Sequence, residues 1–345
     1  MRDKPAAPSE VRGVPVRKFQ KRLAAWYQAN ARDLPWRHTQ DPYHIWISEI
    51  MLQQTRVAAV IPYYERFLRQ FPTVQHLAEV SEQELLAAWS GLGYYSRARN
   101  LRNAARRIVE LGVFPDNYAA IRELAGIGDY TAAAVGSIAF GLPHAAVDGN
   151  VIRVTSRVVC EGGDIGNGAV RKKLARVANE FLDRTSPGRH NQAMMELGAT
   201  VCLPGEPHCE RCPVVKLCRA KALGLELQLP LKRKKTEIFR LDRTILVVEN
   251  KGRLLCWQQP ADARKMAGFW ELPEQEHLPK AVLGEALGTF RHGITNHVYN
   301  FQVFRAESAV VPERFHWLNA VELKDRPMST IARKVLRLFT LVAYR

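Results

Sequence analysis

The chain has 345 residues, 47% of them hydrophobic, which excludes wholesale disorder and favours two folded domains over one. Its formal net charge of +16 favours a polyanionic partner, because clustered lysines and arginines gain affinity by releasing phosphate counterions, although a merely basic soluble protein has the same charge. No apolar run approaches the roughly 20 residues of a membrane span, and residues 1–16 lack the apolar core of a signal peptide, so we expect a cytosolic protein that binds no membrane.

Residues 1–222 are predicted to form an all-α domain. Apolar residues recur there at helical spacing, and turn signals such as Gly91 to Gly93 separate the periodic segments. The predicted helices include residues 45–54, 82–90, 98–111 and 130–140.

A single carboxylate, Glu49, lies in the otherwise apolar or amide-rich stretch W-I-S-E-I-M-L-Q-Q-T, residues 46–55. At an ordinary pKa near 4.3 only about one glutamate in five hundred carries a proton at pH 7, so a general acid needs a raised pKa, which burial supplies. A surface position on an amphipathic helix is the alternative. The neighbours Ile47 and Ile50 argue against a fully solvated face.

A glycine-rich turn, L-A-G-I-G-D-Y-T-A at residues 124–132, places Gly126 and Gly128 immediately before a helix. Bare backbone N–H groups at such a position can approach a phosphate closely. Asp148 follows in V-D-G-N-V, residues 147–151, in a turn ahead of the next helix. Aspartate often caps a helix N-terminus, and a cap and a chemical role can coexist in one residue.

The spacing of four cysteines, Cys202, Cys209, Cys212 and Cys218, is C-x6-C-x2-C-x5-C. In a reducing compartment such closely spaced cysteines are metal or cluster ligands rather than disulfides. One compact loop favours an iron-sulfur cluster over zinc, whose usual pattern is two close pairs separated by a longer stretch, but zinc stays open on spacing alone.

A short basic linker, residues 223–236, precedes a predicted α+β domain at residues 237–345. The predicted strands are residues 244–249, 253–258 and 297–305, and the terminal helix is residues 329–343. G-F-W-E-L-P at residues 268–273 resembles the strand before a Nudix box. The acidic R-E-x-x-E-E helix that would bind magnesium is absent, so we interpret this part as a Nudix-like recognition domain without hydrolase activity.

The first domain resembles the MutY-type adenine DNA glycosylases of the endonuclease III, or helix-hairpin-helix, superfamily. The motifs are L-P-W-R at 34–37, S-E-I-M-L-Q-Q-T at 48–55, G-L-G-Y-Y-S-R-A-R-N at 91–100 and N-Q-A-M-M-E-L-G-A at 191–199, together with the hairpin, the V-D-G-N-V turn and the cysteine loop. The resemblance implies a monomeric base-excision repair enzyme that acts on double-stranded DNA and removes adenine opposite 8-oxoguanine or guanine. It also implies a [4Fe-4S] cluster on the four cysteines.

The resemblance assigns roles to single residues. Glu49 would protonate adenine and Asp148 would stabilise the oxocarbenium-like sugar, while Tyr130 and Asn150 would hold the sugar and the attacking water. Contacts with DNA or with the flipped base are implied for Arg37, Gln53 or Gln54, Tyr94, Gly126, Gly128 and Gln192.

In the family, a loop of the C-terminal domain with the motif F-S-H approaches the base opposite adenine. The matching stretch here is Phe290-Arg291-His292, with arginine in place of serine. Arginine can bind a guanine edge or a phosphate, and phosphate contacts outnumber base contacts in most interfaces. We therefore expect His292 to contact the base and Arg291 to anchor on phosphate.

Two other functions fit parts of the sequence. An endonuclease III-type enzyme would also cleave the strand, through a lysine that forms a Schiff base with the sugar, but Tyr130 occupies that position. A noncatalytic DNA-binding protein would use the hairpin and the cysteine loop only to grip phosphates. The presence of both Glu49 and Asp148 counts against it.

Overall fold

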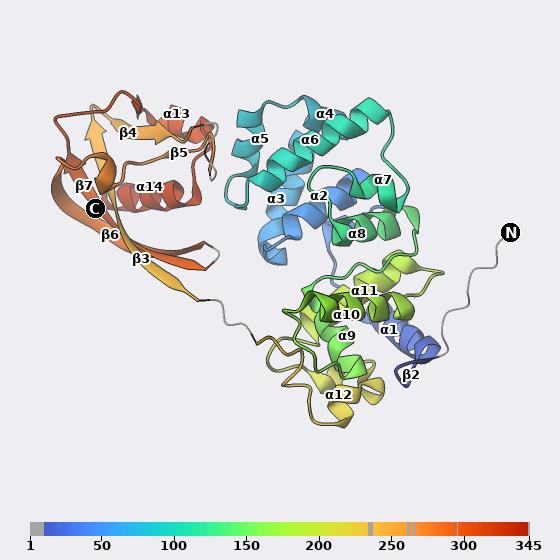
Figure 1. The fold of residues 1–345 in the computed structure, drawn as a ribbon. Coiled ribbons are helices and arrows are strands. Elements are labelled where there is room, and N and C mark those ends of the chain that lie inside the picture. The colour runs from blue at the N-terminus through green and yellow to red at the C-terminus, as the bar shows by residue number, and fades with distance from the viewer. Residues whose placement is uncertain (1–9, 234–236, 261–262, 264–265, 295, 344–345) are drawn as a thin grey trace. The chain divides into compact units, whose positions relative to one another are not determined.

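The computed structural model describes residues 10–233, 237–260, 263, 266–294 and 296–343. By its contacts the chain divides into two units. Unit 1 is Met1–Ala78 with Asn100–Lys235, and unit 2 is Glu79–Arg99 with Thr236–Arg345. Figure 1 colours the helices of unit 1 from blue to yellow and the sheet of unit 2 from orange to red. Among the described helices none is long and apolar enough to cross a membrane.

Unit 1 is built from helices, as predicted. They are α1 (Val16–Asn30), α2 (Pro42–Leu52), α3 (Val57–Gln70), α4 (Val74–Glu79), α6 (Ser96–Leu111), α7 (Tyr118–Arg122), α8 (Asp129–Phe140), α9 (Gly149–Val159), α10 (Gly168–Phe181), α11 (Pro187–Thr200) and α12 (Arg219–Ala222). Short pieces complete the unit: β1 (Glu10–Val11), β2 (Val14–Pro15), and the 3-10 turns η1 (Pro35–Arg37), η2 (Cys209–Arg211) and η3 (Val215–Leu217).

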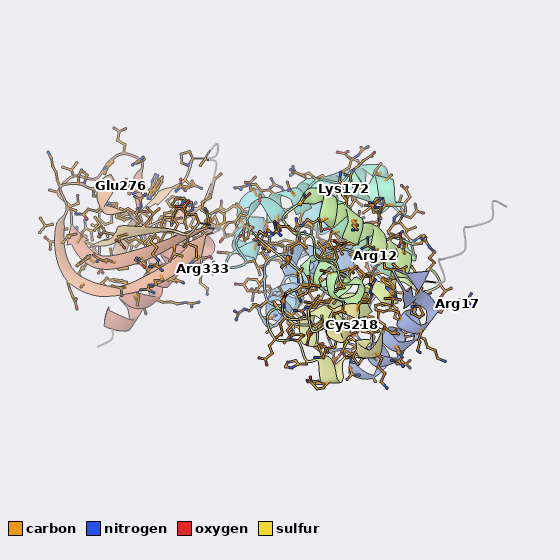
Figure 2. The ribbon with its side chains drawn as sticks, turned by 60° about the horizontal axis from the view of Figure 1, so that its bottom comes forward. Arg12, Arg17, Lys172, Cys218, Glu276 and Arg333 are labelled. Atoms are coloured by element: carbon orange, nitrogen blue, oxygen red, sulfur yellow. The ribbon has the colours of Figure 1, made fainter. Side chains whose placement is uncertain are left out.

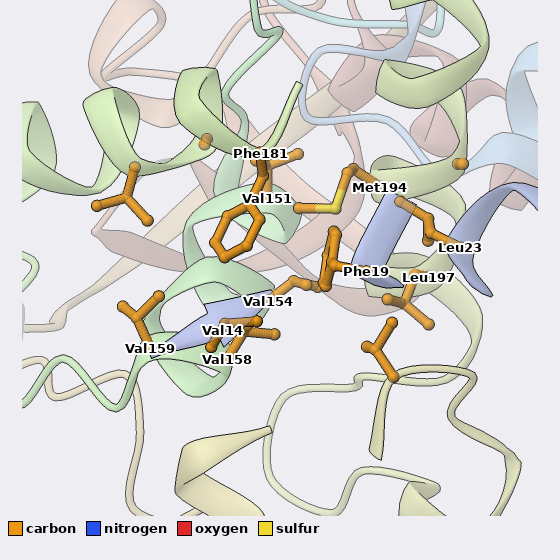
Figure 3. Packing of buried hydrophobic residues seen from close by; sticks show 14 of the residues in the cluster. Val14, Phe19, Leu23, Val151, Val154, Val158, Val159, Phe181, Met194 and Leu197 are labelled. Atoms are coloured by element: carbon orange, nitrogen blue, oxygen red, sulfur yellow. The ribbon is translucent and has the colours of Figure 1, made fainter. Parts of the chain in front are cut away.

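One core of unit 1 lies among α1, α9, α10 and α11 (Figure 3). Helix α1 buries Phe19, Leu23 and Tyr27 at intervals of four residues, the pattern of a helix with one apolar face. Phe19 is fully buried, with its ring centroid 4.6 Å from that of Phe181. This packing fixes the beginning of α9 and the middle of α11 relative to α1.

Helices α2 and α8 pack against each other and bury residues on nearly all sides. Helix α2 buries every residue from Ile45 to Met51, Glu49 included. Helix α8 contributes small side chains, such as Ala132 and Ala133, that let α2 approach closely.

The turn between α7 and α8 requires its first glycine. Gly126 has φ +76°, a conformation that strains residues with a Cβ, and a Cβ added there would lie 2.7 Å from the Cβ of Asn100. Gly128 is the N-cap of α8 in extended conformation, and a Cβ there would meet no atom within 4 Å. The surrounding atoms therefore require glycine at position 126, whereas they would leave room for a side chain at position 128.

Unit 2 combines a mixed sheet with helices, the predicted α+β fold. Its elements are α5 (Glu82–Trp89), β3 (Phe239–Asn250), β4 (Arg253–Gln258), β5 (Trp270–Glu271), η4 (Gln275–His277), β6 (Val282–Ile294), β7 (His297–Glu307), β8 (Phe315–Leu318), α13 (Ala320–Asp325) and α14 (Thr330–Ala343). The strand order is β5-β4-β3-β7-β6, with β8 also paired to β4, and β3 is parallel to β7. Ile245 and Val247 face one core while Leu246 and Val248 face another, so β3 is covered on both sides.

Residues 79–99 share contacts with the C-terminal part of the chain. The Tyr95 ring lies 3.8 Å, centroid to centroid, from that of Phe269, and the Ser90 hydroxyl donates to the carbonyl of Met328 at 2.9 Å. For this reason the division by contacts groups 79–99 with 236–345, whereas the domain boundaries predicted at 222 and 237 follow the order of the chain.

Residues 290–292 lie in a strand, which corrects the loop that the resemblance implies. Phe290, Arg291 and His292 belong to β6 and pair with Phe301, Asn300 and Tyr299 of β7. The rings of Phe290 and Phe301 stack with centroids 5.0 Å apart. Periodicity did not indicate β6 because most of its side chains are exposed.

The glycine turn gives a test of the fold. Gly126→Ala is expected to lower the free energy of unfolding by about 2–4 kcal/mol, since it adds both backbone strain and a steric overlap. Gly141→Ala is the matched control: Gly141 also has positive φ, +65°, but open space around it, so we expect a loss of about 1 kcal/mol. Urea unfolding measures both, and equal losses would contradict the role given to Asn100.

Candidate active site

One pocket of unit 1 gathers most of the catalytic and DNA-contact residues that the sequence predicts. Its walls come from η1, the end of α2, the first turn of α8, the beginning of α9 and the middle of α11. Of the predicted residues it contains Arg37, Glu49, Gln53, Gln54, Gly128, Tyr130, Asp148, Asn150 and Gln192.

Glu49 is a buried acid in this pocket. It is 5% exposed, because α2 is surrounded by other parts of unit 1, and the Tyr130 hydroxyl donates to its Oε2 at 2.6 Å. Burial raises the pKa of Glu49, the hydrogen bond from Tyr130 lowers it, and the negative charge of Asp148 raises it again, with a result of about 7. The carboxyl can therefore carry a proton at neutral pH and release it to a neighbour.

Asp148 caps α9, the role that its position before a helix predicts. Its Oδ1 accepts from the backbone N–H of Val151 at 2.7 Å, and its Oδ2 accepts from Nδ2 of Asn150 at 2.8 Å. Burial is the largest effect and raises the pKa of Asp148 above its ordinary value, although these hydrogen bonds offset part of the rise. Both oxygens thus have donors that favour the charged form.

Arg153, which the sequence analysis did not single out, holds Asn150 in turn. Its guanidinium donates to Oδ1 of Asn150 at 2.8 Å, to the carbonyl of Gly198 at 2.8 Å and to the carbonyl of Cys202 at 2.7 Å. The amide group of Asn150 donates to Asp148 and its carbonyl oxygen accepts from Arg153, so these two hydrogen bonds fix the orientation of the side chain. The only feature of the sequence that could have indicated this contact is the position of Arg153, about one helical turn after Asn150.

A second buried carboxylate, Glu196, was also missed. It is 1% exposed and accepts from Nε of Arg32 at 2.7 Å, from Nη2 of Arg32 at 2.8 Å and from Nη2 of Arg37 at 2.7 Å. Burial raises the pKa of Glu196, but the hydrogen bonds from the two arginines outweigh it and bring the pKa to about 2. Like Glu49, Glu196 is a charged residue in an otherwise apolar helical stretch, and this pattern could have indicated that it is buried.

Gln53 and Gln54 differ in setting. Nε2 of Gln53 donates a hydrogen bond to the Thr131 hydroxyl at 3.4 Å. Gln54 is exposed and has a backbone φ of +59°. Tyr94 belongs to unit 2, is 48% exposed and has φ +48°. Its neighbour Tyr95 is buried against Phe269.

The four cysteines line a single cavity of unit 1 beside α9 and α11; Figure 2 labels Cys218 there. All four are free thiols, and Nη1 of the buried Arg157 lies 3.2 Å from Sγ of Cys202. Burial raises the pKa of Cys212 to about 12, so the thiolate needs a compensating cation. Among the described residues no three such ligands converge on one metal ion. A four-iron cluster requires no such convergence, because each cysteine binds its own iron.

Comparisons with known proteins place this geometry in a family. Residues 47–180 match the family model described as HhH-GPD superfamily base excision DNA repair protein. Adenine DNA glycosylase of Mus musculus is 34% identical over 94% of this chain and 78% of its own length, and that of Homo sapiens is 34% identical over 94% and 74%.

Solved structures share the fold of the helical part. A thermostable thymine-DNA glycosylase is 31% identical, with a TM-score of 0.54 over 60% of this chain and 97% of that one. Endonuclease III in a non-covalent DNA complex is 21% identical, with a TM-score of 0.51 over 61% and 99%, which shows the fold alone. Because the likeness to curated enzymes extends over 94% of the chain and the superfamily match includes Glu49, Tyr130 and Asp148, the chain belongs to the adenine DNA glycosylase family.

Proposed function

We propose that the protein is a monofunctional glycosylase that flips adenine, opposite 8-oxoguanine or guanine, out of double-stranded DNA and hydrolyses its glycosidic bond to leave an abasic site. The observation that carries this proposal is the Glu49 carboxyl, which is 5% exposed, accepts a hydrogen bond from Tyr130 and has a pKa of about 7. At pH 7 roughly half of the molecules hold a proton on it, compared with about one in five hundred for an ordinary glutamate.

Glu49 is the proton donor to N7 of adenine, which makes the base a neutral leaving group. As the bond breaks, positive charge develops on the deoxyribose, and the Asp148 carboxylate stabilises it. Deprotonated Glu49 then takes a proton from the water that adds to the anomeric carbon, which returns the acid to its starting state. Tyr130 and Asn150 hold the sugar and the water through the hydroxyl and amide that orient the two carboxyls.

DNA contacts would come from residues that line the pocket and from residues outside it. Arg37 and Gln192 face the flipped base, while Gln53 or Gln54 and Tyr94 fill the gap that it leaves. The hairpin glycines Gly126 and Gly128 would bring backbone N–H groups to a phosphate. Support for the duplex-penetrating role of Gln54 and Tyr94 comes from their exposure and from their left-handed backbone, which projects them at sharp turns.

Hydrolysis without strand cleavage follows from the chemistry of position 130. A Schiff base with the sugar needs an amine. Tyr130 has a phenol whose pKa burial raises well above its ordinary value, and none of the described residues lining the pocket is a lysine. An endonuclease III-type lyase reaction is therefore not favoured.

We further propose that Cys202, Cys209, Cys212 and Cys218 hold a [4Fe-4S] cluster. Their common cavity and free thiols support it, and the Arg157 guanidinium would help to offset the negative charge of the thiolates. When bound, such a cluster would tie η2, η3 and the end of α11 into one rigid loop.

The choice of the opposite base is proposed for unit 2. Arg291 and His292 are adjacent on β6, so their side chains point to opposite faces of the sheet. His292 is half-buried, and burial and then the charge of Lys334 lower its pKa, so it is neutral at pH 7 and has both a donor and an acceptor for a base edge. Exposed Arg291 suits a separate phosphate contact.

Glu49→Gln keeps the shape of the side chain and removes the proton. We expect adenine excision to fall by at least about 10²–10⁴-fold, while duplex binding persists. Since the raised pKa keeps Glu49 protonated up to about pH 7, the wild-type rate should fall about tenfold per pH unit above that value. Single-turnover excision measured from pH 5 to 9 checks both points. Glu65→Gln, an exposed glutamate of α3, should behave as wild type; a Glu49→Gln variant that turns over normally would refute the assignment.

Metal analysis tests the cluster. Anaerobically purified protein should contain about four irons and four sulfides per chain. Cys209→Ser should lose iron and fold or bind DNA poorly, whereas Cys160→Ser, outside the cavity, should keep its iron. Stoichiometric zinc without iron would remove the cluster from the proposal.

His292→Ala tests base choice in the full chain. We expect the ratio of excision rates for adenine opposite 8-oxoguanine and opposite guanine to fall roughly tenfold, the worth of one base contact. Arg291→Ala should slow both substrates equally, and His316→Ala, an exposed histidine of β8, should change neither. An equal loss on both substrates in His292→Ala would make this strand a general DNA contact.

A further inference from the structure

Base choice within the pocket of unit 1 must depend on side chains rather than on the fold. A structure named as a thymine-DNA glycosylase shares that fold at a TM-score of 0.54. Glu49 and Asp148 act on the leaving group and the sugar, which leaves the groups that meet the ring edges of the base. Gln192 is one of them, and its side chain is hydrogen-bonded to a residue of α1.

Tyr27 of α1 holds Gln192 of α11. The Tyr27 hydroxyl lies 2.9 Å from Oε1 of Gln192 and donates to it. Tyr27 is 7% exposed, and its ring packs in the core around α1. Gln192 is half-buried and lines the pocket, and its Nε2 has no hydrogen-bond partner among the described residues.

The chemistry of the pair favours this direction of the hydrogen bond over its reverse. A phenol is a good donor and a poor acceptor, because its oxygen lone pair is delocalised into the ring, whereas an amide carbonyl is a strong acceptor. The Arg37 guanidinium lies over the Tyr27 ring, 5.4 Å from its centroid, and its charge makes the hydroxyl a better donor still. Burial raises the pKa of Tyr27, so the proton stays on the oxygen.

We propose that Tyr27 is a specificity-determining positioning residue: its hydroxyl occupies the carbonyl of Gln192 and so turns the amide N–H2 of Gln192 toward the flipped base, where it selects a ring nitrogen that accepts a hydrogen bond. The inference rests on the proposed adenine excision and deepens it.

The ligand chemistry that this donor reads is specific. With N7 of adenine assigned to Glu49, the ring acceptors left are N1 and N3. A base that carries a proton at the contacted nitrogen would face the amide with a second donor, and a buried pair of donors costs more than a missing hydrogen bond. Without the Tyr27 hydroxyl the amide could rotate and offer its carbonyl instead, and this selection would weaken.

The experiment compares single-turnover excision of adenine, 1-deazaadenine and 3-deazaadenine, each opposite guanine, by the full-length protein. The penalty is the rate on adenine divided by the rate on the analogue. Removal of a ring nitrogen also changes the intrinsic reactivity of the base, but this factor is the same for every variant and cancels when penalties are compared. For one of the two analogues, Tyr27→Phe should reduce the wild-type penalty roughly three- to tenfold, the worth of one neutral hydrogen bond.

Gln192→Leu should reduce the same penalty by the same factor, and the double variant should reduce it no further, since both changes remove one interaction. The matched control is Tyr43→Phe, which removes another buried hydroxyl, bonded to the carbonyl of Phe71 at 2.8 Å outside this pocket, and should keep both wild-type penalties.

Wild-type penalties retained in Tyr27→Phe or in Gln192→Leu, or no penalty in the wild type, would overturn the inference. If Tyr27→Phe fails to fold, a wild-type penalty retained in Gln192→Leu still overturns the inference. Failure of the proposed function gives a different result, because the wild-type protein would then leave adenine itself in place.

Discussion

Burial of the Glu49 carboxyl is the constraint on which the pocket of unit 1 depends. A charged carboxylate in this position would have lost its water and gained in return one hydrogen bond, from the Tyr130 hydroxyl, and the weaker effect of the Arg37 charge, with the Asp148 charge opposing it. The group therefore accepts a proton instead. Helix α2 imposes this burial, because its neighbours on both sides along the chain, from Ile45 to Met51, are buried as well, and no rotation of the helix would bring Glu49 to water without exposing them.

Three carboxyls of one pocket, two buried and one half-buried, show that hydrogen-bond and charge partners, and not burial alone, set the protonation of a carboxyl. Glu196 meets two guanidinium groups, which outweigh burial and hold its pKa at about 2. Asp148 meets a helix N-terminus and an amide, which favour its charged form without a full opposite charge. Glu49 has one neutral donor and a pKa of about 7. One pocket thus holds a carboxylate fixed as an anion, a carboxyl with a donor on each oxygen, and a carboxyl that can carry a proton near neutral pH.

The sequence predicted what is local. Helical periodicity located α2, α5, α6 and α8 to within three residues, and residue type before a helix identified the cap Asp148. It did not reveal Arg32 with Glu196, which are far apart in the chain, because ion pairs of that kind depend on how α11 packs beside η1. Strand β6 was missed since its exposed residues lack the alternation of a half-buried strand, and its pairing with β7 is what turns 290–292 from an expected loop into a strand.

Residues of helix α9 connect the pocket with the cysteine loop through a series of contacts. Asp148 caps its N-terminus, Arg153 one turn later bonds Asn150 on one side and the Cys202 carbonyl on the other, and Arg157 a further turn on contacts Cys202 Sγ. Gly198 closes this arrangement: a Cβ there would lie 2.5 Å from the Cβ of Asn150, so α11 can approach α9 only through glycine. Displacing Cys202 would remove one of the carbonyls that hold Arg153, while the carbonyl of Gly198 would still accept from it. The cysteine loop therefore contacts the arginine that holds Asn150, although no cysteine is among the described residues that line the pocket.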